Sequence, residues 1–199
     1  FNIGDEYLSL SKKFGYWRDT HIKIIGTAVE DLQWRFFKDW VFAAKKYNIQ
    51  WNMELSERPK KGKAGIQIVS SGPDSKWASV KDGYFKMIAN ARERIYIQTP
   101  YFIPDDSIFE ALRVAGLSGI DVKVMIPCKP DHPFVYWAGL SYIGELLEAG
   151  VRFYTYQNGF LHCKTFIMDD FVTSIGTANL DIRSFKLNFE VNAFIYDED

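Results

Sequence analysis

Residues 161–176 contain the feature that most restricts the fold of this chain. Two runs rich in Val, Ile, Phe and Thr, at 161–168 and 171–176, are typical of β-strands. Asp169-Asp170 between them suits a two-residue hairpin turn. The sequence therefore predicts an antiparallel hairpin, in which position 164 pairs with position 175 and position 162 with position 177.

The predicted hairpin gathers polar side chains on one face. Alternation along a strand puts His162 and Lys164 on the same side. The predicted register places Thr177 across from His162, and Asn179 leaves the second strand just beyond. A nucleophile beside a fixed cation is what attack on a phosphate ester needs. A lone strand histidine is usually structural, but several polar groups at fixed offsets favour a catalytic site.

The remaining polar residues of the hairpin have other expected roles. Asp169 has the opposite parity to His162 and sits at the turn, so we expect it to be structural. Cys163 points away from the site and is expected to be a small buried thiol. A disulfide between Cys128 and Cys163 is possible, but reduced core thiols fit these apolar runs better.

The spacing carries a resemblance to a known family. His162-x-Lys164-x4-Asp169-x6-Gly176-Thr177-x-Asn179 resembles the HKD motif of the phospholipase D superfamily. Four other segments resemble the bacterial cardiolipin synthases within it: 178–190, 99–105, 154–162 and Trp17-Arg18-Asp19-Thr20-His21. The resemblance covers essentially the whole chain.

The opening of the chain resembles the tail of a first HKD motif, with Asn2 in the role that Asn179 plays in the second. The resemblance therefore implies a fragment of a two-half protein whose missing first-half segment is its partner. Residues 1–54 would be a remnant of the first half, 55–63 a linker, and 64–199 the second half with the HKD motif.

Strands alternating with helices predict an α/β fold. The resemblance implies a phospholipase D-like layered mixed sheet flanked by helices. Expected strands are 19–25, 65–70, 94–99, 121–126, 151–156 and 189–196, besides the hairpin; expected helices are 28–46, 76–92, 105–117 and 134–149. Gly119 and Gly150 are placed as helix stops. The aromatic stripe of 28–46 favours a core face over a membrane or ligand surface.

The resemblance also implies roles for single residues. His162 would be the nucleophile or the acid and base of the reaction, and Glu190 would orient its ring. Lys164 would be catalytic and, with Thr177 and Asn179, would bind phosphoryl oxygens. Gly176 and Asp169 would be structural members of the motif, and Asp19 would orient the absent first histidine.

Other candidates have weaker support. His21 and His132 have no strong case for a role, and their spacing from His162 does not suit a metal. Tyr101, Phe102 and Trp137 could line an acyl or headgroup pocket, although a core role is the safer interpretation.

The implied activity is that of a phosphatidyltransferase. A phosphatidyl group would pass from one phosphatidylglycerol to another through a phosphohistidine, and glycerol would leave. No cofactor or metal is needed, and the fragment alone is expected to be inactive. Alternatives are a hydrolytic phospholipase D, another HKD phosphodiesterase or nuclease, and a non-catalytic membrane-surface domain.

Charge and hydropathy restrict the partners and the location. A net charge of −1 fits a dedicated nucleic-acid binder poorly. No run of apolar residues is long enough to span a bilayer, so the fragment should be soluble. The resemblance implies phosphatidylglycerol and a membrane lipid surface as partners, and the bacterial cell membrane as the location of the full-length protein.

Overall fold

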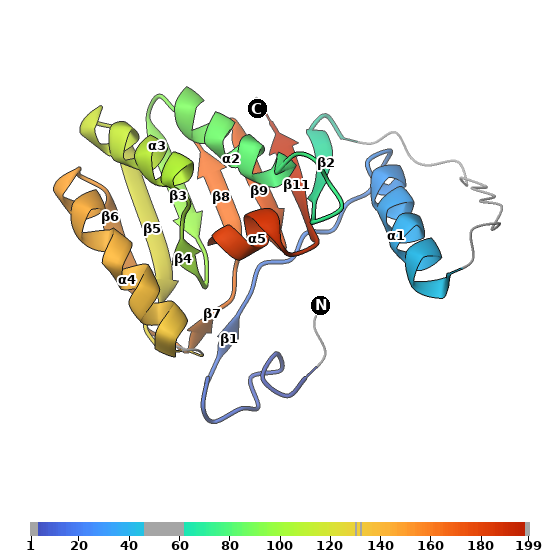
Figure 1. The fold of residues 1–199 in the computed structure, drawn as a ribbon, viewed down its shortest axis with the longest axis horizontal. Helices are drawn as coiled ribbons and strands as arrows, with labels where there is room; N and C mark the ends of the chain where they lie inside the picture. The colour runs from blue at the N-terminus through green and yellow to red at the C-terminus, as the bar shows by residue number, and fades with distance from the viewer. Residues whose placement is uncertain (1–3, 46–61, 130, 132, 198–199) are drawn as a thin grey trace.

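A seven-stranded mixed sheet forms the centre of the computed structural model, which describes residues 4–45, 62–129, 131 and 133–197 (Figure 1). The strand order is β2-β11-β9-β8-β3-β5-β6. Its strands are β2 (Gly65–Ser71), β3 (Arg94–Gln98), β5 (Asp121–Pro127), β6 (Arg152–Tyr156), β8 (Thr165–Met168), β9 (Val172–Gly176) and β11 (Glu190–Tyr196). Strands β3, β5 and β6 are parallel, and the other neighbours are antiparallel. The predicted α/β fold with a mixed sheet is confirmed.

Three helices lie side by side on one face of this sheet: α2 (Ser79–Asn90), α3 (Asp106–Leu117) and α4 (Pro133–Glu148) (Figure 1). Strands β3 and β5 bury every second residue, including Ile95, Ile97, Val122 and Val124. The residues between them, such as Tyr96 and Lys123, are only half-buried. Parallel strands are usually covered on both faces, whereas the described residues cover the second face of β3 and β5 only in part.

Local signals set the helix ends. The side chain of Asp105 accepts a hydrogen bond of 3.1 Å from the backbone N–H of Ile108 and so caps the start of α3. Gly119 and Gly150 adopt positive φ angles of 85° and 93° just after α3 and α4. Glycine tolerates this left-handed conformation, so both predicted helix stops are confirmed.

Two short parallel pairings connect distant parts of the chain. Strand β1 (Trp17–Arg18) pairs with β7 (Phe160–Leu161), and β4 (Phe102–Ile103) pairs with β10 (Leu180–Asp181). Helix α5 (Ile182–Lys186) follows β10. The first pairing brings the N-terminal segment beside the motif, and the second brings the loop after β3 beside the motif's end.

The predicted hairpin exists, but its register is shifted by one residue. Met168 pairs with Val172, so the turn contains three residues instead of the two that we predicted. Thr165, not Lys164, pairs with Ile175. Asp169 adopts a left-handed φ of 50°, which aspartate tolerates, and neighbouring backbone groups hold its carboxylate. The predicted strand 161–168 is also split into β7 and β8, and residues 162–164 lie between them.

The N-terminal part departs most from expectation. The predicted strand 19–25 is wrong, because pairing stops after Arg18 and the following residues have no neighbouring strand. Helix α1 (Val29–Ala44) forms where predicted, yet none of its residues is buried. Phe36 is 62% exposed and Trp40 is 55% exposed, so the stripe is not a core face within the described residues. The predicted linker 55–63 lies mostly outside them, and the domain division stays a prediction.

Candidate active site

The pairing of β1 with β7 builds one side of the site. The N–H of His162 donates a 2.7 Å hydrogen bond to the carbonyl of Arg18, which extends the pairing by one residue. Asp19 follows directly, and its Oδ2 lies 2.8 Å from Nδ1 of His162. A carboxylate only accepts, so Nδ1 carries the proton and Nε2 is left as the reactive nitrogen.

Aromatic residues of the N-terminal segment surround the His162 ring. The ring centroid of Trp17 lies 5.0 Å away, and Tyr7 makes an edge contact at 6.1 Å. Only 21% of the His162 side chain is exposed, and Asp19 is about half-exposed. Burial alone would raise the pKa of Asp19, but its hydrogen bonds to His162 and to the N–H of Thr20 lower it overall. Asp19 is therefore a carboxylate that can stabilise a protonated His162.

Lys164 is buried beside this pair. Its Nζ donates a 2.6 Å hydrogen bond to the backbone carbonyl of His162. Burial lowers the pKa of Lys164 to about 8, although attraction to Asp19 and Glu190 acts in the opposite direction. Two of its three N–H bonds remain for an anion.

Residues at the end of β9 and at the start of β11 form the second side of the site. The hydroxyl of Thr177 donates to Oε2 of Glu190 and accepts a 3.0 Å hydrogen bond from the N–H of Val191. Asn188 donates to the other carboxylate oxygen at 3.2 Å. Burial raises the pKa of Glu190, because these hydrogen bonds only partly compensate for lost hydration.

These contacts correct three expectations. Asp19, not Glu190, is hydrogen-bonded to His162, because the β1–β7 pairing places Asp19 at Nδ1. Asp19 is consequently engaged by a histidine of this chain and not by an absent one. Thr177 uses its hydroxyl proton on Glu190, so it has none left for a phosphoryl oxygen. Asn2 and His132 lie outside the described residues.

Asn179 and Gly176 complete the second side. The side chain of Asn179 is half-buried, and its amide oxygen has no partner among the residues the structure describes. A Cβ atom at Gly176 would come within 2.3 Å of the Asn192 side chain. Only glycine fits there, and this close approach gives Gly176 its structural role.

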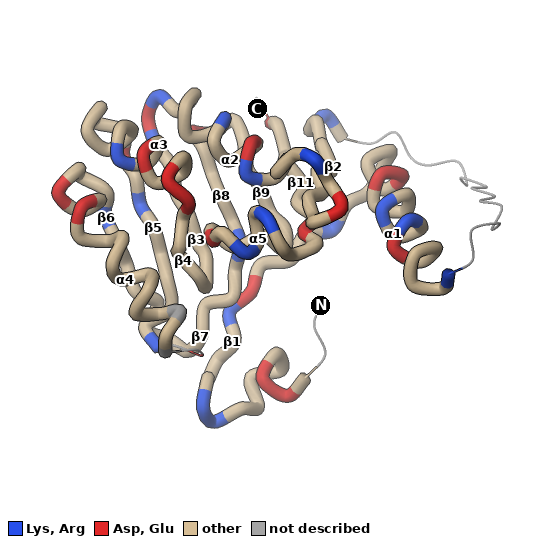
Figure 2. Tube along the Cα trace, viewed as in Figure 1, with Lys and Arg blue, Asp and Glu red and all other residues tan. Residues whose placement is uncertain are grey.

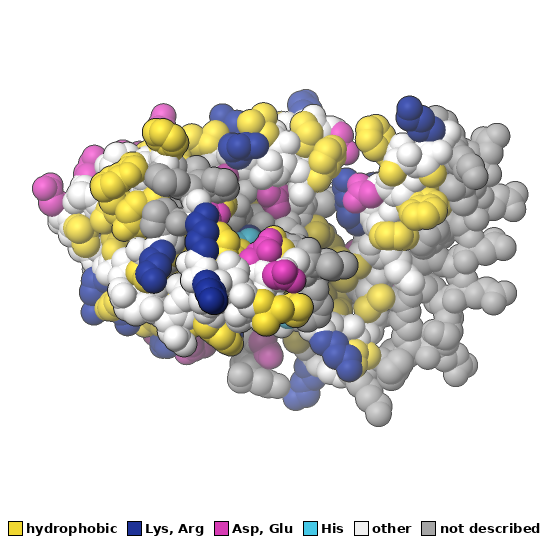
Figure 3. Space-filling view, turned by 90° about the horizontal axis from the view of Figure 1, so that it is seen from below, with side chains coloured by type: hydrophobic (Ala, Val, Ile, Leu, Met, Phe, Trp, Pro, Cys, Tyr) yellow, Lys and Arg dark blue, Asp and Glu magenta, His cyan; other side chains and the backbone are white. Residues whose placement is uncertain are grey.

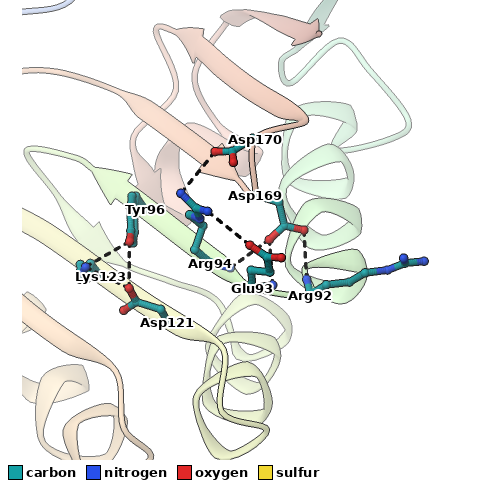
Figure 4. Close-up of polar contacts among 8 residues, drawn as sticks. All are labelled: Arg92, Glu93, Arg94, Tyr96, Asp121, Lys123, Asp169 and Asp170. Carbon is teal, nitrogen blue, oxygen red and sulfur yellow. Dashed lines mark hydrogen bonds and ion pairs between the residues drawn. The ribbon is translucent and has the colours of Figure 1, made fainter. Parts of the chain in front are cut away.

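Asp169 lies away from this site, at the start of β3 (Figure 4). Its carboxylate accepts hydrogen bonds of 2.9 to 3.1 Å from the backbone N–H groups of Arg92, Glu93 and Arg94. Burial would raise the pKa of Asp169, but these three donors lower it. It ties the hairpin turn to the neighbouring strand.

Other candidates lie at the margins. Tyr101 donates its hydroxyl proton to Asp131, and burial together with this bond raises its pKa. Phe102 is buried and Trp137 is 66% exposed. Sequence reasoning missed the ring contacts of Tyr7 and Trp17 with His162, because only the β1–β7 pairing reveals them. Cys128 and Cys163 are both free thiols, as the apolar runs predicted.

Metal and membrane signals can be stated for the described part of the chain. There, no group of three or more His, Cys, Asp or Glu residues is placed to hold a metal ion. No helix in the same residues has the length and apolarity needed to cross a bilayer.

Seen from below in Figure 3, histidine, acidic and hydrophobic side chains lie near one another around the centre of the surface.

Comparison with known proteins places this geometry in a family. The family model described as "Cardiolipin synthase, PLD-like domain" matches residues 84–199. The chain is 61% identical over 198 residues to the major cardiolipin synthase ClsA of Bacillus subtilis (strain 168), which covers 99% of this chain and 41% of that protein. It is 57% identical to a cardiolipin synthase of Oceanobacillus iheyensis, over 100% of this chain and 41% of the relative. The chain thus spans about two fifths of these relatives.

Solved structures share the fold. A phosphatidylserine synthase of Haemophilus influenzae has a TM-score of 0.69 at 18% identity and covers 98% of this chain and 54% of its own. The phospholipase D family member NUC of Salmonella typhimurium has a TM-score of 0.57 at 20% identity and covers 68% of this chain and 84% of its own. With the family model spanning more than half of its residues, the chain belongs to the phospholipase D-like domain family of the cardiolipin synthases.

Proposed function

We propose that this chain supplies one half of the catalytic centre of a cardiolipin synthase. The reaction would transfer a phosphatidyl group from one phosphatidylglycerol to the hydroxyl of another and release glycerol. The observation that carries the proposal is the Asp19–His162 hydrogen bond beside the buried Lys164. A histidine with a fixed tautomer and an adjacent cation provides the nucleophile and the charge that phosphoryl transfer needs.

The geometry of His162 suits both steps of such a transfer. As nucleophile, Nε2 would form a bond to phosphorus while the bond from phosphorus to the glycerol oxygen breaks. The second lipid's hydroxyl would then displace the histidine, so one phosphodiester is made for each one broken. As acid and base, the same nitrogen would give a proton to the leaving oxygen and later take one from the attacking hydroxyl. Asp19 stabilises the imidazolium in either role.

Lys164 and Asn179 are the proposed ligands of the phosphoryl oxygens. Lys164 has free N–H bonds, and the amide of Asn179 offers further donors. Thr177 instead would hold Glu190 in place.

Glu190 is proposed to orient a second histidine outside this chain. Its hydrogen-bond partners are Thr177 and Asn188, while Asp19 occupies His162. A buried carboxylate with a raised pKa gains by pairing with an imidazolium. The relatives are more than twice as long as this chain, which leaves room for a second half that carries this histidine.

The same missing part is the proposed partner of two surfaces. Strands β3 and β5 bury only alternate residues, and α1 buries none. The exposed Phe36 and Trp40 on α1 stack with 6.0 Å between ring centroids, and large apolar side chains that gather on one exposed face usually meet a partner. We propose that the remainder of the longer protein covers both surfaces, and that its substrates come from a bacterial membrane.

A chimera tests the function. The 198 matching residues of the Bacillus subtilis relative would be replaced by this chain, and phosphatidylglycerol vesicles would be the substrate. Cardiolipin and glycerol should appear together, and His162→Ala should abolish both while the chimera stays folded. Ser118→Ala is the control, since that exposed hydroxyl bonds to the carbonyl of Val114 at the end of α3, away from the site and from both surfaces.

The identity of the product separates the alternatives. Phosphatidic acid in place of cardiolipin would contradict the transferase proposal and favour a hydrolytic phospholipase D. Cleavage of nucleic acid would favour a nuclease, although positive and negative residues are interspersed along the described chain (Figure 2). A folded chimera that forms neither lipid product nor phosphoenzyme would favour a non-catalytic membrane-surface domain.

A further inference from the structure

Ala178 lies between the two motif residues Thr177 and Asn179 and is almost fully buried, at 2% exposed. The regular pairing of β9 ends at Gly176, so its ladder does not satisfy the backbone of the next three residues. Buried N–H and C=O groups need partners. In this segment, other elements supply them.

Three consecutive N–H groups are bonded to three separate partners. Thr177 donates to the carbonyl of Val191 at 3.0 Å, and Ala178 donates to Oδ1 of Asn192 at 3.3 Å. Asn179 donates to the hydroxyl of Ser184 at 3.2 Å. All three backbone donors are used within the protein, so only side chains of this segment can contact a bound phosphate.

The contacts of Ala178 close into a ring. Asn192 accepts from the Ala178 N–H and donates through Nδ2 to the hydroxyl of Tyr84 at 2.8 Å. Tyr84 in turn donates to the Ala178 carbonyl at 3.4 Å. The same Nδ2 also reaches the hydroxyl of Ser174 at 3.0 Å. Side chains from α2 and β11 therefore hold both polar groups of one backbone residue.

The ring of Tyr84 is fixed independently of its hydroxyl. It stacks on Phe166 with 5.0 Å between ring centroids, and Tyr84 is 2% exposed. Phenylalanine at this position would keep the packing and lose only the hydroxyl contacts. The hydroxyl therefore has a role that apolar packing does not require.

We propose that Tyr84 and Asn192 are positioning residues, which clamp Ala178 so that Thr177 holds Glu190 and Asn179 faces the substrate phosphate. This inference rests on the proposed function for the role of Asn179, but the clamp itself is a property of the fold. Neither residue touches the reacting atoms. Both act through the backbone of residue 178.

The test compares two hydroxyl deletions in this chain. Tyr84→Phe removes the hydrogen bond to the Ala178 carbonyl and the acceptor that holds Nδ2 of Asn192. Tyr96→Phe removes a half-buried hydroxyl from β3 that bonds to Asp121 and Lys123. Hydrogen exchange at the Ala178 amide reports the clamp directly. Titration with inorganic phosphate, followed by the NMR signals of the Asn179 side chain, reports the site. A thermal melt checks that each variant is folded.

Tyr84→Phe should speed exchange at Ala178 at least about tenfold and weaken phosphate binding by about the same factor. Tyr96→Phe should leave both within about twofold, even where its melting temperature falls equally. Asn192→Ala removes the acceptor of the Ala178 N–H itself, together with the donors to Tyr84 and Ser174. It should speed exchange at Ala178 more than Tyr84→Phe does.

Different results would contradict the clamp on Ala178 and the proposed function. Unchanged exchange at Ala178 in a folded Tyr84→Phe variant would overturn the clamp, whatever phosphate does. Faster exchange with wild-type phosphate affinity would overturn the positioning role. Absence of phosphate binding by the wild-type chain would count against the proposed function, and exchange at Ala178 would then decide the clamp alone.

Discussion

The two carboxylates of the site, Asp19 and Glu190, differ in exposure, in hydrogen-bond partners and in the direction of their pKa shifts. Asp19 is half-exposed, bonds to a histidine and has a lowered pKa. Glu190 is 8% exposed, bonds to neutral side chains and has a raised pKa. Asp19 therefore already has its hydrogen-bond partner, His162, within this chain. The raised pKa of Glu190 agrees with the proposal that it pairs with a second histidine outside this chain.

The strongest test of this difference is the activity of the chain by itself. One histidine cannot act at once as nucleophile and as acid for the leaving alcohol. We therefore expect purified 1–199 to release no glycerol from phosphatidylglycerol vesicles under conditions in which the chimera is active. Release that disappears with His162→Ala would contradict the two-half interpretation and favour a symmetric dimer of this chain.

A large effect is also expected from neutralising either carboxylate in the chimera. Asp19→Asn should lower kcat by roughly 10² to 10⁴. The amide N–H can donate to Nδ1 of His162 and so favour the tautomer whose proton is on Nε2. Glu190→Gln should also lower activity, but less completely than His162→Ala, because in the proposed role Glu190 only orients and stabilises a histidine. Wild-type turnover in Glu190→Gln would remove that residue from the site.

The NMR signals of the His162 ring separate the two carboxylates in the isolated chain. They should shift in Asp19→Asn and stay within error in Glu190→Gln.

Lys164 lies between the two carboxylates, and its pKa of about 8 predicts pH-dependent anion binding. An ordinary lysine stays protonated to about pH 10, whereas Lys164 should lose its charge as the pH rises through 8. Sulfate affinity of the chain should fall by roughly ten times between pH 7 and pH 9.5. Lys164→Gln should bind sulfate weakly and show no such step. Constant affinity up to pH 10 would contradict the burial of this charge.

The smallest expected effect is on stability, and it has opposite signs for the two groups. The lowered pKa of Asp19 stabilises the folded chain above the unfolded value of 3.8, and this contribution is lost as the pH falls through the folded pKa. The raised pKa of Glu190 means that the folded chain binds more protons. Its contribution is therefore fullest at low pH and is lost as the pH rises from 4.5 through the folded pKa.

Urea unfolding from pH 2 to pH 7 measures both signs, because Asp19 loses its contribution below 3.8 and Glu190 loses its contribution above 4.5. Asp19→Asn should destabilise by less than about 1 kcal/mol at pH 7, because the pair is partly screened by solvent. Glu190→Gln should be neutral or stabilising by on the order of 1 kcal/mol at pH 7, since it removes a buried charge. A clear loss of stability in Glu190→Gln at pH 7 would show that its charge is already compensated.

Features that depend on neighbouring residues could be predicted from the sequence. Gly119, Gly150 and Asp105 act within one helical turn, and the helices they delimit were found where expected. The hairpin turn could not be predicted to the residue, because the backbone N–H groups of Arg92 and Glu93, just before β3, hold Asp169. Those groups are more than seventy positions away in the sequence.

The sequence indicated candidate residues for the site but not which of them form hydrogen-bonded pairs. The spacing of His162, Lys164 and Asn179 indicated the chemistry, yet the partner of His162 follows from a two-residue strand pairing. The apolar stripe of α1 shows a similar limit. Periodicity identifies an apolar face, but it does not say whether the partner of that face belongs to the described residues.

The contact between Asp19 and His162 also bears on the order of folding. It joins residues 143 positions apart, whereas much of the α2–β3–α3–β5 core connects near neighbours in the chain. Closing so long a loop costs conformational entropy, which contacts formed at a later stage offset. This pairing should therefore form late in folding. In a partly folded chain, His162 would lack the hydrogen bond to Asp19, so either ring nitrogen could carry the proton. His162 would then acquire a fixed tautomer only after the segment around Asp19 has paired with the segment around His162.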